Sequence, residues 1–170
     1  MSDIVIRQAS GPADLDTVRQ LCWEYRDYLL GHSDEVRRAV LLSYGLESYR
    51  ALMNSLAEKH ARPNGIILLA EHGGMPVACG MYHPLSDTDA EIKRVYVRPE
   101  ARGTGTGRQL SQALIAQTRA DGFSRVFLDT SRRFTDAQRL YESLGFRARG
   151  EYRDLPAGMA EFLVFYELSL

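Results

Sequence analysis

The sequence has few cysteines and no long apolar run. Its only cysteines, Cys22 and Cys79, cannot build a disulfide framework and lack the spacing of a metal site, so we expect both in the core. The longest purely aliphatic stretch runs from Ile66 to Ala70, far below the ~20 residues that a membrane helix needs. The N-terminus also lacks the basic and apolar segments of a signal peptide. We therefore expect a cytoplasmic protein that makes no membrane contact.

An excess of basic charge is also missing. The chain has 21 Lys and Arg against 22 Asp and Glu, a net charge of −1. Proteins that bind nucleic acid carry surplus positive charge to neutralise phosphates, so a nucleic-acid partner is not expected. With 170 residues, 45% of them hydrophobic, and no linker rich in Pro, Gly or Ser, the sequence predicts a single domain over residues 1–170.

Apolar spacing divides the first half of the chain into a strand, three helices and three strands. Helical spacing follows Ser10-Gly11-Pro12, where proline suits a first turn, and Gly31 is expected to end that helix. The predicted strands are 4–8, 66–71, 76–83 and 91–98, and the predicted helices start at Gly11, run from 34 to about 42, and include 49–56.

The second half alternates helices and strands. A helix carries Leu110 and Gln117 and ends at Gly122, and a strand follows at 125–129. Another helix covers 135–144, with Thr135 and Gln138 as a capping box, before strands at 146–152 and 161–168. The sum is an α+β domain with a mixed, mostly antiparallel sheet. The helical crossover between 91–98 and 125–129 predicts that these two strands are parallel neighbours.

The strongest chemical signal is Arg-Gly-Thr-Gly-Thr-Gly at residues 102–107, between a strand and a helix. Free amides and the helix dipole at such a place attract anions. It is no P-loop, because Arg108-Gln109 follows Gly107 where a Lys should stand, and it does not fit the Gly-x-Gly-x-x-Gly dinucleotide fingerprint. By itself the loop is equally compatible with a phosphate site and with a plain turn.

Three motifs in order resemble the GNAT family of N-acetyltransferases. Residues 102–107 fit its Arg/Gln-x-x-Gly-x-Gly/Ala loop, residues 91–101 are similar to its fourth strand, and Ala137-x-x-Leu140-Tyr141-x-x-x-Gly145-Phe146 is similar to its later helix. The resemblance covers the whole domain. It implies a GNAT-like acyl-CoA N-acyltransferase fold, in which helices flank the sheet and the parallel strands splay apart. It also implies acetyl-CoA as co-substrate and no metal.

The resemblance also assigns the cofactor-binding residues. Backbone groups at the splay would pair with the pantetheine arm, and the glycine loop would hold the pyrophosphate. Arg108 is a further phosphate contact by this assignment, although an arginine in a first helical turn is more often solvated. One departure is Phe134, where many members have Asn, which removes one side-chain contact. The expected contacts are Val95, Tyr96, Val97, Arg102, Gly103, Thr104, Gly105, Thr106, Gly107 and Arg108.

Tyr141 and Glu91 are the expected catalytic residues. Spacing alone places Tyr141 in a core and Glu91 at a solvated strand start. The resemblance instead implies that Tyr141 protonates the departing thiolate, and that Glu91, eleven residues before Arg102, acts as base or substrate ligand. A base role needs a pKa raised by burial, which Lys93 would oppose. Strand periodicity predicts that Glu91, Lys93, Val95 and Val97 share one face.

The acceptor residues are the least determined. Glu24 and Tyr28 on the first helix and Tyr82 on a strand are candidates, although such residues are usually packing. His32, His60, His72 and His83 have no ligand spacing and are expected at the surface or in turns.

The expected reaction is direct acetyl transfer from acetyl-CoA to a primary amine of a small molecule. Alternatives are a protein lysine or N-terminal acetyltransferase and a non-catalytic acyl-CoA-binding or regulatory module. A homodimer through the C-terminal strands is possible from the sequence, which leaves the acceptor and the acyl-chain length open.

Overall fold

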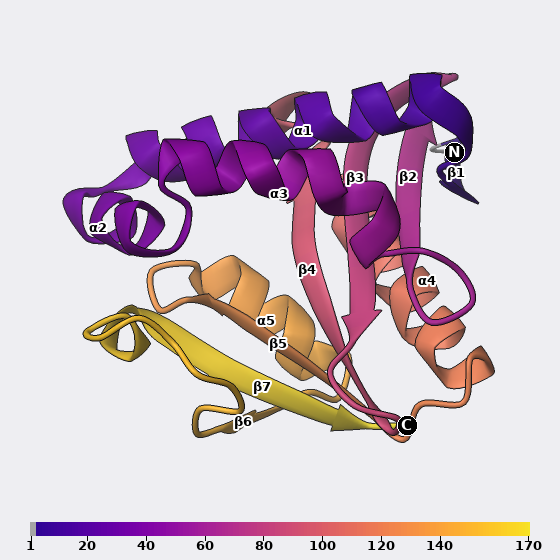
Figure 1. Ribbon diagram of the computed structural model, residues 1–170. Coiled ribbons are helices and arrows are strands. Elements are labelled where there is room, and N and C mark those ends of the chain that lie inside the picture. Colours follow the sequence, from indigo (N-terminus) through magenta and orange to yellow (C-terminus); the bar gives the residue numbers. More distant parts are fainter. Residues whose placement is uncertain (1–2) are drawn as a thin grey trace.

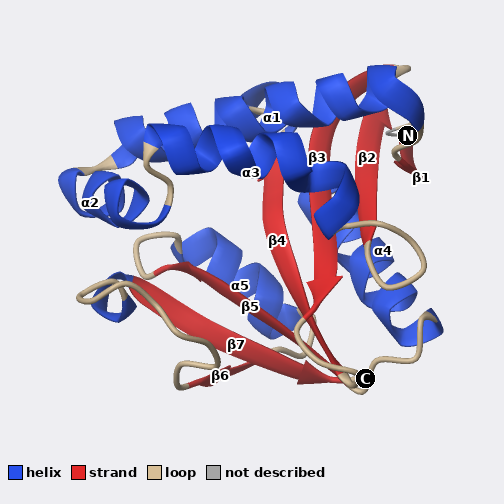
Figure 2. Cartoon of the chain, viewed as in Figure 1, coloured by secondary structure: helices blue, strands red, loops and turns tan. Residues whose placement is uncertain are grey.

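The structure is a computed structural model that describes residues 3–170. One sheet carries helices on both of its faces (Figures 1 and 2). The elements are, in order, β1 (Ile4–Gln8), α1 (Gly11–His32), α2 (Asp34–Ser43), α3 (Leu46–Lys59), β2 (Ile66–His72), β3 (Met75–Pro84), β4 (Asp89–Val97), the 3₁₀ turn η1 (Pro99–Ala101), α4 (Thr106–Ala120), β5 (Arg125–Ser131), α5 (Thr135–Ser143), β6 (Arg147–Arg149), the 3₁₀ turn η2 (Ala160–Phe162) and β7 (Leu163–Ser169).

Within residues 3–170 the strands form a seven-stranded sheet of order β1-β2-β3-β4-β5-β7-β6. Strands β1 to β4 are antiparallel neighbours, and Gly73 and Gly74 make the β2–β3 turn with positive φ values. The α4 crossover makes β4 and β5 parallel, whereas β5, β7 and β6 pair antiparallel. The predicted mixed sheet and parallel pair are therefore confirmed.

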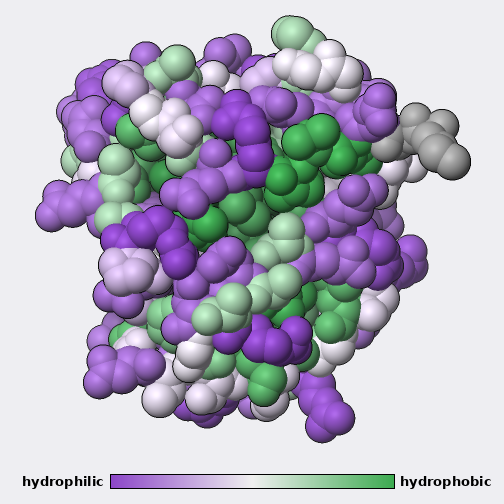
Figure 3. Space-filling model, turned by 90° about the vertical axis from the view of Figure 1, so that its right-hand side faces the viewer, coloured by the Kyte–Doolittle hydropathy of each residue, from purple (hydrophilic) through white to green (hydrophobic). Residues whose placement is uncertain are grey.

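The helices divide between the two faces of the sheet. Helices α1 and α3 cover one face, where Leu21 and Met53 pack against Leu69. Helices α4 and α5 pack on the other face, where Leu110 and Tyr141 belong to the same buried cluster. Cys22 and Cys79 are buried and unpaired in the α1–α3 layer, as predicted. On the side that carries β1 and α4, hydrophilic side chains prevail and apolar ones show through the middle (Figure 3).

The parallel strands separate after a short contact. Strand β4 pairs with β5 only from Asp89 to Glu91, opposite 125–127, although both strands continue well beyond this point. Beyond it the two strands diverge (Figure 1), and helix α2 lies across the wide end of the opening. The predicted splay is confirmed, and it leaves the second half of β4 without a strand partner on that side.

A β-bulge in β4 changes which residues share a face. Met81 pairs with Lys93 but Cys79 pairs with Tyr96, so β4 has one extra residue there, and Arg94 takes a positive φ of 51°. The extra residue turns Val95 and Val97 toward α4, into the cluster that holds Ile92. The expectation that they share a face with Glu91 is therefore wrong, because strict alternation ignores a bulge.

Some local expectations also fail. No side chain caps α5, whose N-cap is Phe134, and Gln138 Nε2 instead donates to the Ser131 carbonyl, 3.1 Å away. The capping box is therefore wrong. The strand expected at 146–152 shortens to β6, which pairs with β7 only over 147–149. Helix α1 continues one residue past Gly31.

Two further features concern the described part of the chain. None of the helices in residues 3–170 is long and apolar enough to cross a membrane. No group of three or more His, Cys, Asp or Glu in that range is placed to hold a metal ion.

Candidate active site

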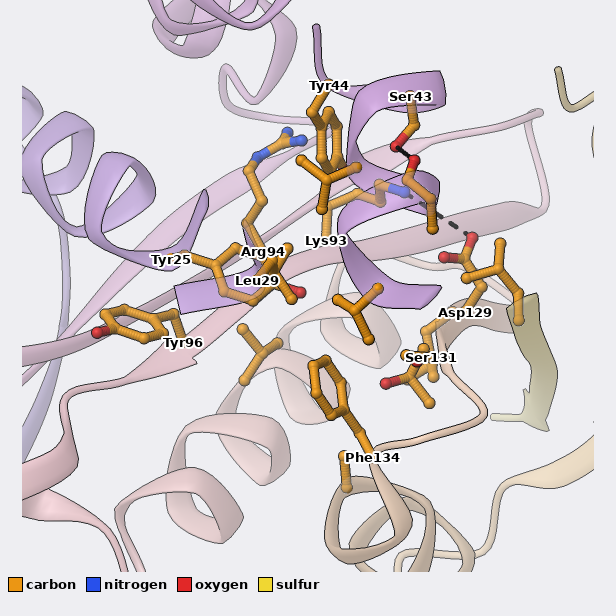
Figure 4. A pocket seen from close by; sticks show the side chains of 18 of the residues that line it. Tyr25, Leu29, Ser43, Tyr44, Lys93, Arg94, Tyr96, Asp129, Ser131 and Phe134 are labelled. Atoms are coloured by element: carbon orange, nitrogen blue, oxygen red, sulfur yellow. Dashed lines mark hydrogen bonds and ion pairs between the residues drawn. The ribbon is translucent and has the colours of Figure 1, made fainter. Parts of the chain in front are cut away.

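A cavity of about 760 Å³ occupies the splay between β4 and β5. Its walls come from α1, α2, β4, β5 and the N-terminal part of α5, and Figure 4 shows their side chains converging on it. The volume suits a small-molecule site. Because the opening passes through the sheet, its walls include Val95 and Tyr141 from the α4–α5 layer as well as Glu91 and Lys93 from the α1–α3 layer.

The glycine loop presents unused amides at one end of this opening. No hydrogen bond within residues 3–170 uses the backbone N–H groups of residues 103–108, and the first α4 bond runs from Gln109 N to Gly105 O. Gly103 and Gly105 have φ values of 76° and 88°, which side chains disfavour, and a Cβ on Gly103 would meet open space. Thr104 and Thr106 bond each other through their hydroxyls, 2.7 Å apart. The loop can therefore hold an anion through its backbone.

The backbone of β4 points the right way for an extended ligand. Arg98 N donates to Val77 O at 2.9 Å across the β3 side. Strand alternation then turns the N–H and C=O of Val97 toward the splay. The Val97 carbonyl accepts a hydrogen bond from Arg102 Nε at 3.0 Å, and its N–H faces the part of the splay where β4 does not pair with β5. Arg102 therefore lies at the mouth of the cavity, beside the loop.

Aromatic side chains support Arg102 there. Its guanidinium carbon lies 4.5 Å from the centre of the Tyr28 ring and 6.0 Å from that of Tyr96. Tyr28 also stacks on Phe134, with ring centres 5.9 Å apart, and both line the cavity. Phe134 thus gives the cavity an apolar wall, and Tyr28 and Tyr96 lie beside Arg102 at the same place.

Tyr141 lies in the cavity wall on α5 and is only 8% exposed. Its ring packs against Phe146 and Tyr166, and its hydroxyl makes no hydrogen bond to any of residues 3–170. Burial, reinforced by the negative charge of Asp129, raises the pKa of Tyr141 to about 12. The phenol therefore stays protonated at neutral pH and can donate a hydrogen bond into the cavity.

Glu91 is buried, 3% exposed, and bound on both oxygens. It accepts hydrogen bonds from His83 Nε2 (2.9 Å), the Tyr152 hydroxyl (2.6 Å) and Arg153 Nε (2.9 Å). Burial alone would raise the pKa of Glu91, but these donors and the charge of Lys93 outweigh it and leave the pKa below its usual value. The raised pKa that a base role would need is therefore absent, and Lys93 opposes it as expected.

Asp129 completes a charged cluster on the same side of the splay. It accepts hydrogen bonds from Arg153 Nη2 at 2.6 Å and from the Tyr152 hydroxyl at 3.1 Å. Lys93 Nζ lies 3.9 Å from a carboxylate oxygen of Asp129 (Figure 4) and 3.9 Å from one of Glu91. The two carboxylates thus share their cations, and the cluster joins β4, β5 and the segment before β7.

Three predicted site residues lie elsewhere. Glu24 forms a bidentate ion pair with Arg98, at 2.7 and 2.8 Å, outside the cavity. Tyr82 is fully buried in the α4 layer, and its hydroxyl bonds Asp121. Arg108 Nη2 donates to Ser143 Oγ at 2.8 Å, which fixes α4 to α5 rather than turning toward the loop. Residue type and spacing could not show that each already has a protein partner.

Residues that sequence reasoning missed gather around Arg94. His60 was expected at the surface or in a turn; it lies in the turn after α3 but is only 2% exposed, and it bonds Arg94 Nη2 through Nε2 at 2.9 Å. Tyr44 and Lys59 line the same part of the cavity. No local pattern could have found this group, because it joins residues from α3, from the turns on either side of α3, and from the bulge. The one available signal was Arg94 itself, a charged residue at an apolar position of the strand.

Comparison with known proteins agrees with this geometry. The chain matches the Acetyltransferase (GNAT) family over residues 19–146. It is 33% identical over 162 residues to an uncharacterized N-acetyltransferase of Schizosaccharomyces pombe, covering 91% of this chain and 90% of that protein. It is 34% identical over 113 residues to the IAA acetyltransferase of Azospirillum brasilense, covering 65% of this chain and 71% of the relative.

Solved structures show the same fold. An acetyltransferase from Streptococcus agalactiae superposes with a TM-score of 0.74 at 16% identity, covering 98% of both chains. A putative acetyltransferase from Salmonella typhimurium, solved with acetyl-CoA, gives 0.71 at 21% identity and covers 98% of this chain and 94% of that one. The chain therefore belongs to the GNAT family of N-acetyltransferases and is an acyltransferase whose donor is acetyl-CoA.

Proposed function

We propose that the protein transfers the acetyl group of acetyl-CoA directly to a primary amine of a small molecule. One observation carries the proposal: a single cavity connects Tyr141 and the open backbone of β4 with the charged cluster around Glu91. Two substrates held together in such a space react without a covalent enzyme intermediate. Holding them in register can supply ~7–11 kcal/mol of the barrier, more than acid–base help provides.

The chain's own groups fit the donor. The unused amides of residues 103–108 are free to bind the pyrophosphate, with Arg102 beside them. The N–H and C=O of Val97, and by the same alternation those of Val95, face the splay and would pair with the amides of the pantetheine arm. Acetyl-CoA supplies the activated acetyl thioester.

Tyr141 assists the leaving sulfur by donating a hydrogen bond. A phenol with a pKa of about 12 is a weaker acid than the thiol it would form, whose ordinary pKa is ~8.5. Full proton transfer before the sulfur leaves is therefore unfavourable. The hydroxyl instead stabilises the growing negative charge on sulfur through a hydrogen bond and keeps its proton, which makes Tyr141 helpful but dispensable.

Glu91 holds Tyr152 and Arg153 in place on the side of the cavity proposed for the acceptor. Its carboxylate is occupied by three donors and its pKa is lowered, both of which disfavour proton abstraction. We assign it the role of a positioning residue that orients Tyr152 and Arg153. The acceptor amine would lose its proton to water, aided by the nearby cations, which disfavour an ammonium ion.

The contacts of helix α2 at the wide end of the cavity favour a small acceptor over a peptide. Helix α2 contacts η2, and Glu35 on α2 forms ion pairs with Arg132 and Arg133, beyond the end of β5. These contacts join α2 to η2 and to the end of β5 at the wide end of the splay, where an extended peptide would need an open groove. A protein lysine or N-terminus is therefore the less favoured acceptor.

A thiol-release assay tests the proposal. Purified protein, acetyl-CoA and a panel of small primary amines should release coenzyme A at rates that depend on the amine, and mass spectrometry should find the amine acetylated. Peptides with free N-termini and lysines serve as the comparison panel. Calorimetric binding of acetyl-CoA without release by any amine would refute the proposed acceptor class, as would turnover of peptides alone.

A further inference from the structure

Arg94 is a buried cation without a counter-ion. It is 5% exposed, and no carboxylate of residues 3–170 lies within 4.0 Å of its guanidinium. Its Nε is buried and makes no hydrogen bond. By contrast, Arg153 nearby binds both Glu91 and Asp129. A buried charge normally has a partner, because leaving it unpaired costs several kcal/mol.

The backbone is bent to put Arg94 there. Its φ of 51° lies in the left-handed region, which costs a residue with a side chain on the order of 1 kcal/mol or more. The bulge around it interrupts the β3–β4 ladder. Strain of this kind persists where the surrounding structure enforces it, and it is concentrated at functional sites.

His60 fixes the guanidinium in orientation. His60 Nδ1 lies 2.9 Å from the Tyr82 carbonyl, which can only accept, so Nδ1 carries the proton. Nε2 is then free to accept from Arg94 Nη2 at 2.9 Å. Burial, with the charge of Arg94, lowers the pKa of His60 to about 2, which keeps the ring neutral. The histidine therefore holds Arg94 without neutralising its charge.

The surroundings of Arg94 are positive. Lys59 and Lys93 line the same part of the cavity, and burial, with the charges of Arg94 and Lys93, lowers the pKa of Lys59. Burial would raise the pKa of the Tyr44 phenol, yet the charges of Lys93 and Arg94 bring it below its usual value. The two carboxylates in reach, Glu91 and Asp129, are already occupied by Arg153 and Tyr152. Arg94 points up toward Tyr44 in Figure 4.

We propose that Arg94 binds a carboxylate of the acceptor, so that the acceptor is an amine that also carries a carboxylate, such as an amino acid. The inference rests on the proposed function and narrows it. The carboxylate supplies the missing counter-ion and can take two N–H donors from the guanidinium fork. The acceptor's amine then lies within the same cavity as Tyr141.

Matched pairs of acceptors test this inference. L-Phenylalanine, L-tyrosine and L-leucine are compared with phenethylamine, tyramine and isoamylamine, which differ from them by the carboxylate alone. In thiol release with acetyl-CoA, the best amino acid should exceed its decarboxylated partner in kcat/KM by about 30-fold or more, because a charged, desolvated pair is lost. Equal or better turnover of the decarboxylated amines would overturn the inference while leaving the proposed function standing.

Arg94→Gln removes the charge and keeps N–H donors. It should lower kcat/KM for the amino acid, chiefly through KM, by about 30-fold more than for its decarboxylated partner. Arg94→Lys should restore part of the loss, since it keeps the charge but not the fork. An equal loss on both members of a pair would assign Arg94 a merely structural role and overturn the inference.

Two measurements without turnover complete the test. Arg94→Gln should leave the Kd of acetyl-CoA unchanged, because Arg94 is not among the groups assigned to the donor. With coenzyme A present, N-acetyl-L-phenylalanine should raise the Tm of the wild type but not of the variant, and N-acetylphenethylamine should raise neither by as much. If no amine of any kind is acetylated, the proposed function fails, and this thermal shift still decides whether a carboxylate binds at Arg94.

Discussion

At the residue scale, Tyr141 shows how burial raises the pKa of a phenol and keeps it protonated. The ring packs in the α4–α5 layer, as helical spacing predicts, and the residue also lines the cavity. Its pKa of about 12 means that it remains a donor throughout the usual assay range.

Tyr141→Phe removes only this hydroxyl. We expect kcat to fall by about 10², the low end of general acid–base effects, while the Kd of acetyl-CoA and Tm stay near the wild-type values. Steady-state kinetics at saturating substrates measures the loss. A variant that turns over as fast as the wild type would exclude any role of the hydroxyl in the reaction.

Glu91→Gln distinguishes a positioning carboxylate from a base. Loss of the buried charge should destabilise the fold by about 3 kcal/mol, because Lys93 and Arg153 lose a counter-ion. The pKa of Glu91 is lower in the folded than in the unfolded state. The stability that its charge gives to the fold is therefore complete above a pH of about 4.3 and is lost as the pH falls below that value. The free energy of unfolding, measured by denaturation from pH 7 to 3, should therefore decline less for the variant than for the wild type.

The kinetics of the same variant supply the contrasting outcome. A positioning role predicts a rise in KM for the acceptor and a pH–rate profile of unchanged shape. If Glu91→Gln instead kept its stability and lost kcat together with the acidic limb of the profile, Glu91 would be the base after all.

At the element scale, the sequence located nearly every helix and strand but not the bulge. Apolar spacing is strong in α1 and α3, and glycines mark the turns, so these elements could be predicted. The change of sheet face at Val95 and Val97 could not be predicted, because one extra residue at Arg94 leaves the composition of the strand unchanged. The same limit explains why Tyr82 and Glu24 were misplaced, since their partners are distant in the chain.

The glycine loop gives a prediction at this scale. Gly105→Glu places a negative side chain beside the free amides and should weaken acetyl-CoA binding on the order of 100-fold or more, because like charges then face each other. Gly105→Ala is the matched control, since it shares the strain of a φ of 88° without the charge. Calorimetry measures both. Similar Kd values for the two variants would mean that the pyrophosphate binds elsewhere.

At the scale of the whole molecule, one buried histidine links stability to pH. His60 has a folded pKa of about 2, whereas an unfolded histidine titrates near 6.5. The unfolded state therefore binds more protons as the pH falls, and the folded state loses stability below about pH 6.5.

The expected contribution of His60 to this loss is about 1.4 kcal/mol between pH 7.5 and 5.5. The variant His60→Gln keeps a donor and an acceptor. Its free energy of unfolding, measured by urea denaturation, should decline less over this interval than that of the wild type. His72→Gln, at an exposed histidine, should follow the wild type. Identical slopes for His60→Gln and the wild type would contradict the buried, neutral state of the ring.

The passage through the sheet has a consequence for the order of events. The glycine loop and Val97 belong to the α4–α5 side, whereas Glu91, Lys93 and Asp129 are reached from the α1–α3 side. Neither reactant then blocks the entry of the other. Coenzyme A can also leave while the acetylated product is still bound. Initial-rate plots at several fixed concentrations of one reactant should accordingly intersect, as expected when both reactants are bound before transfer.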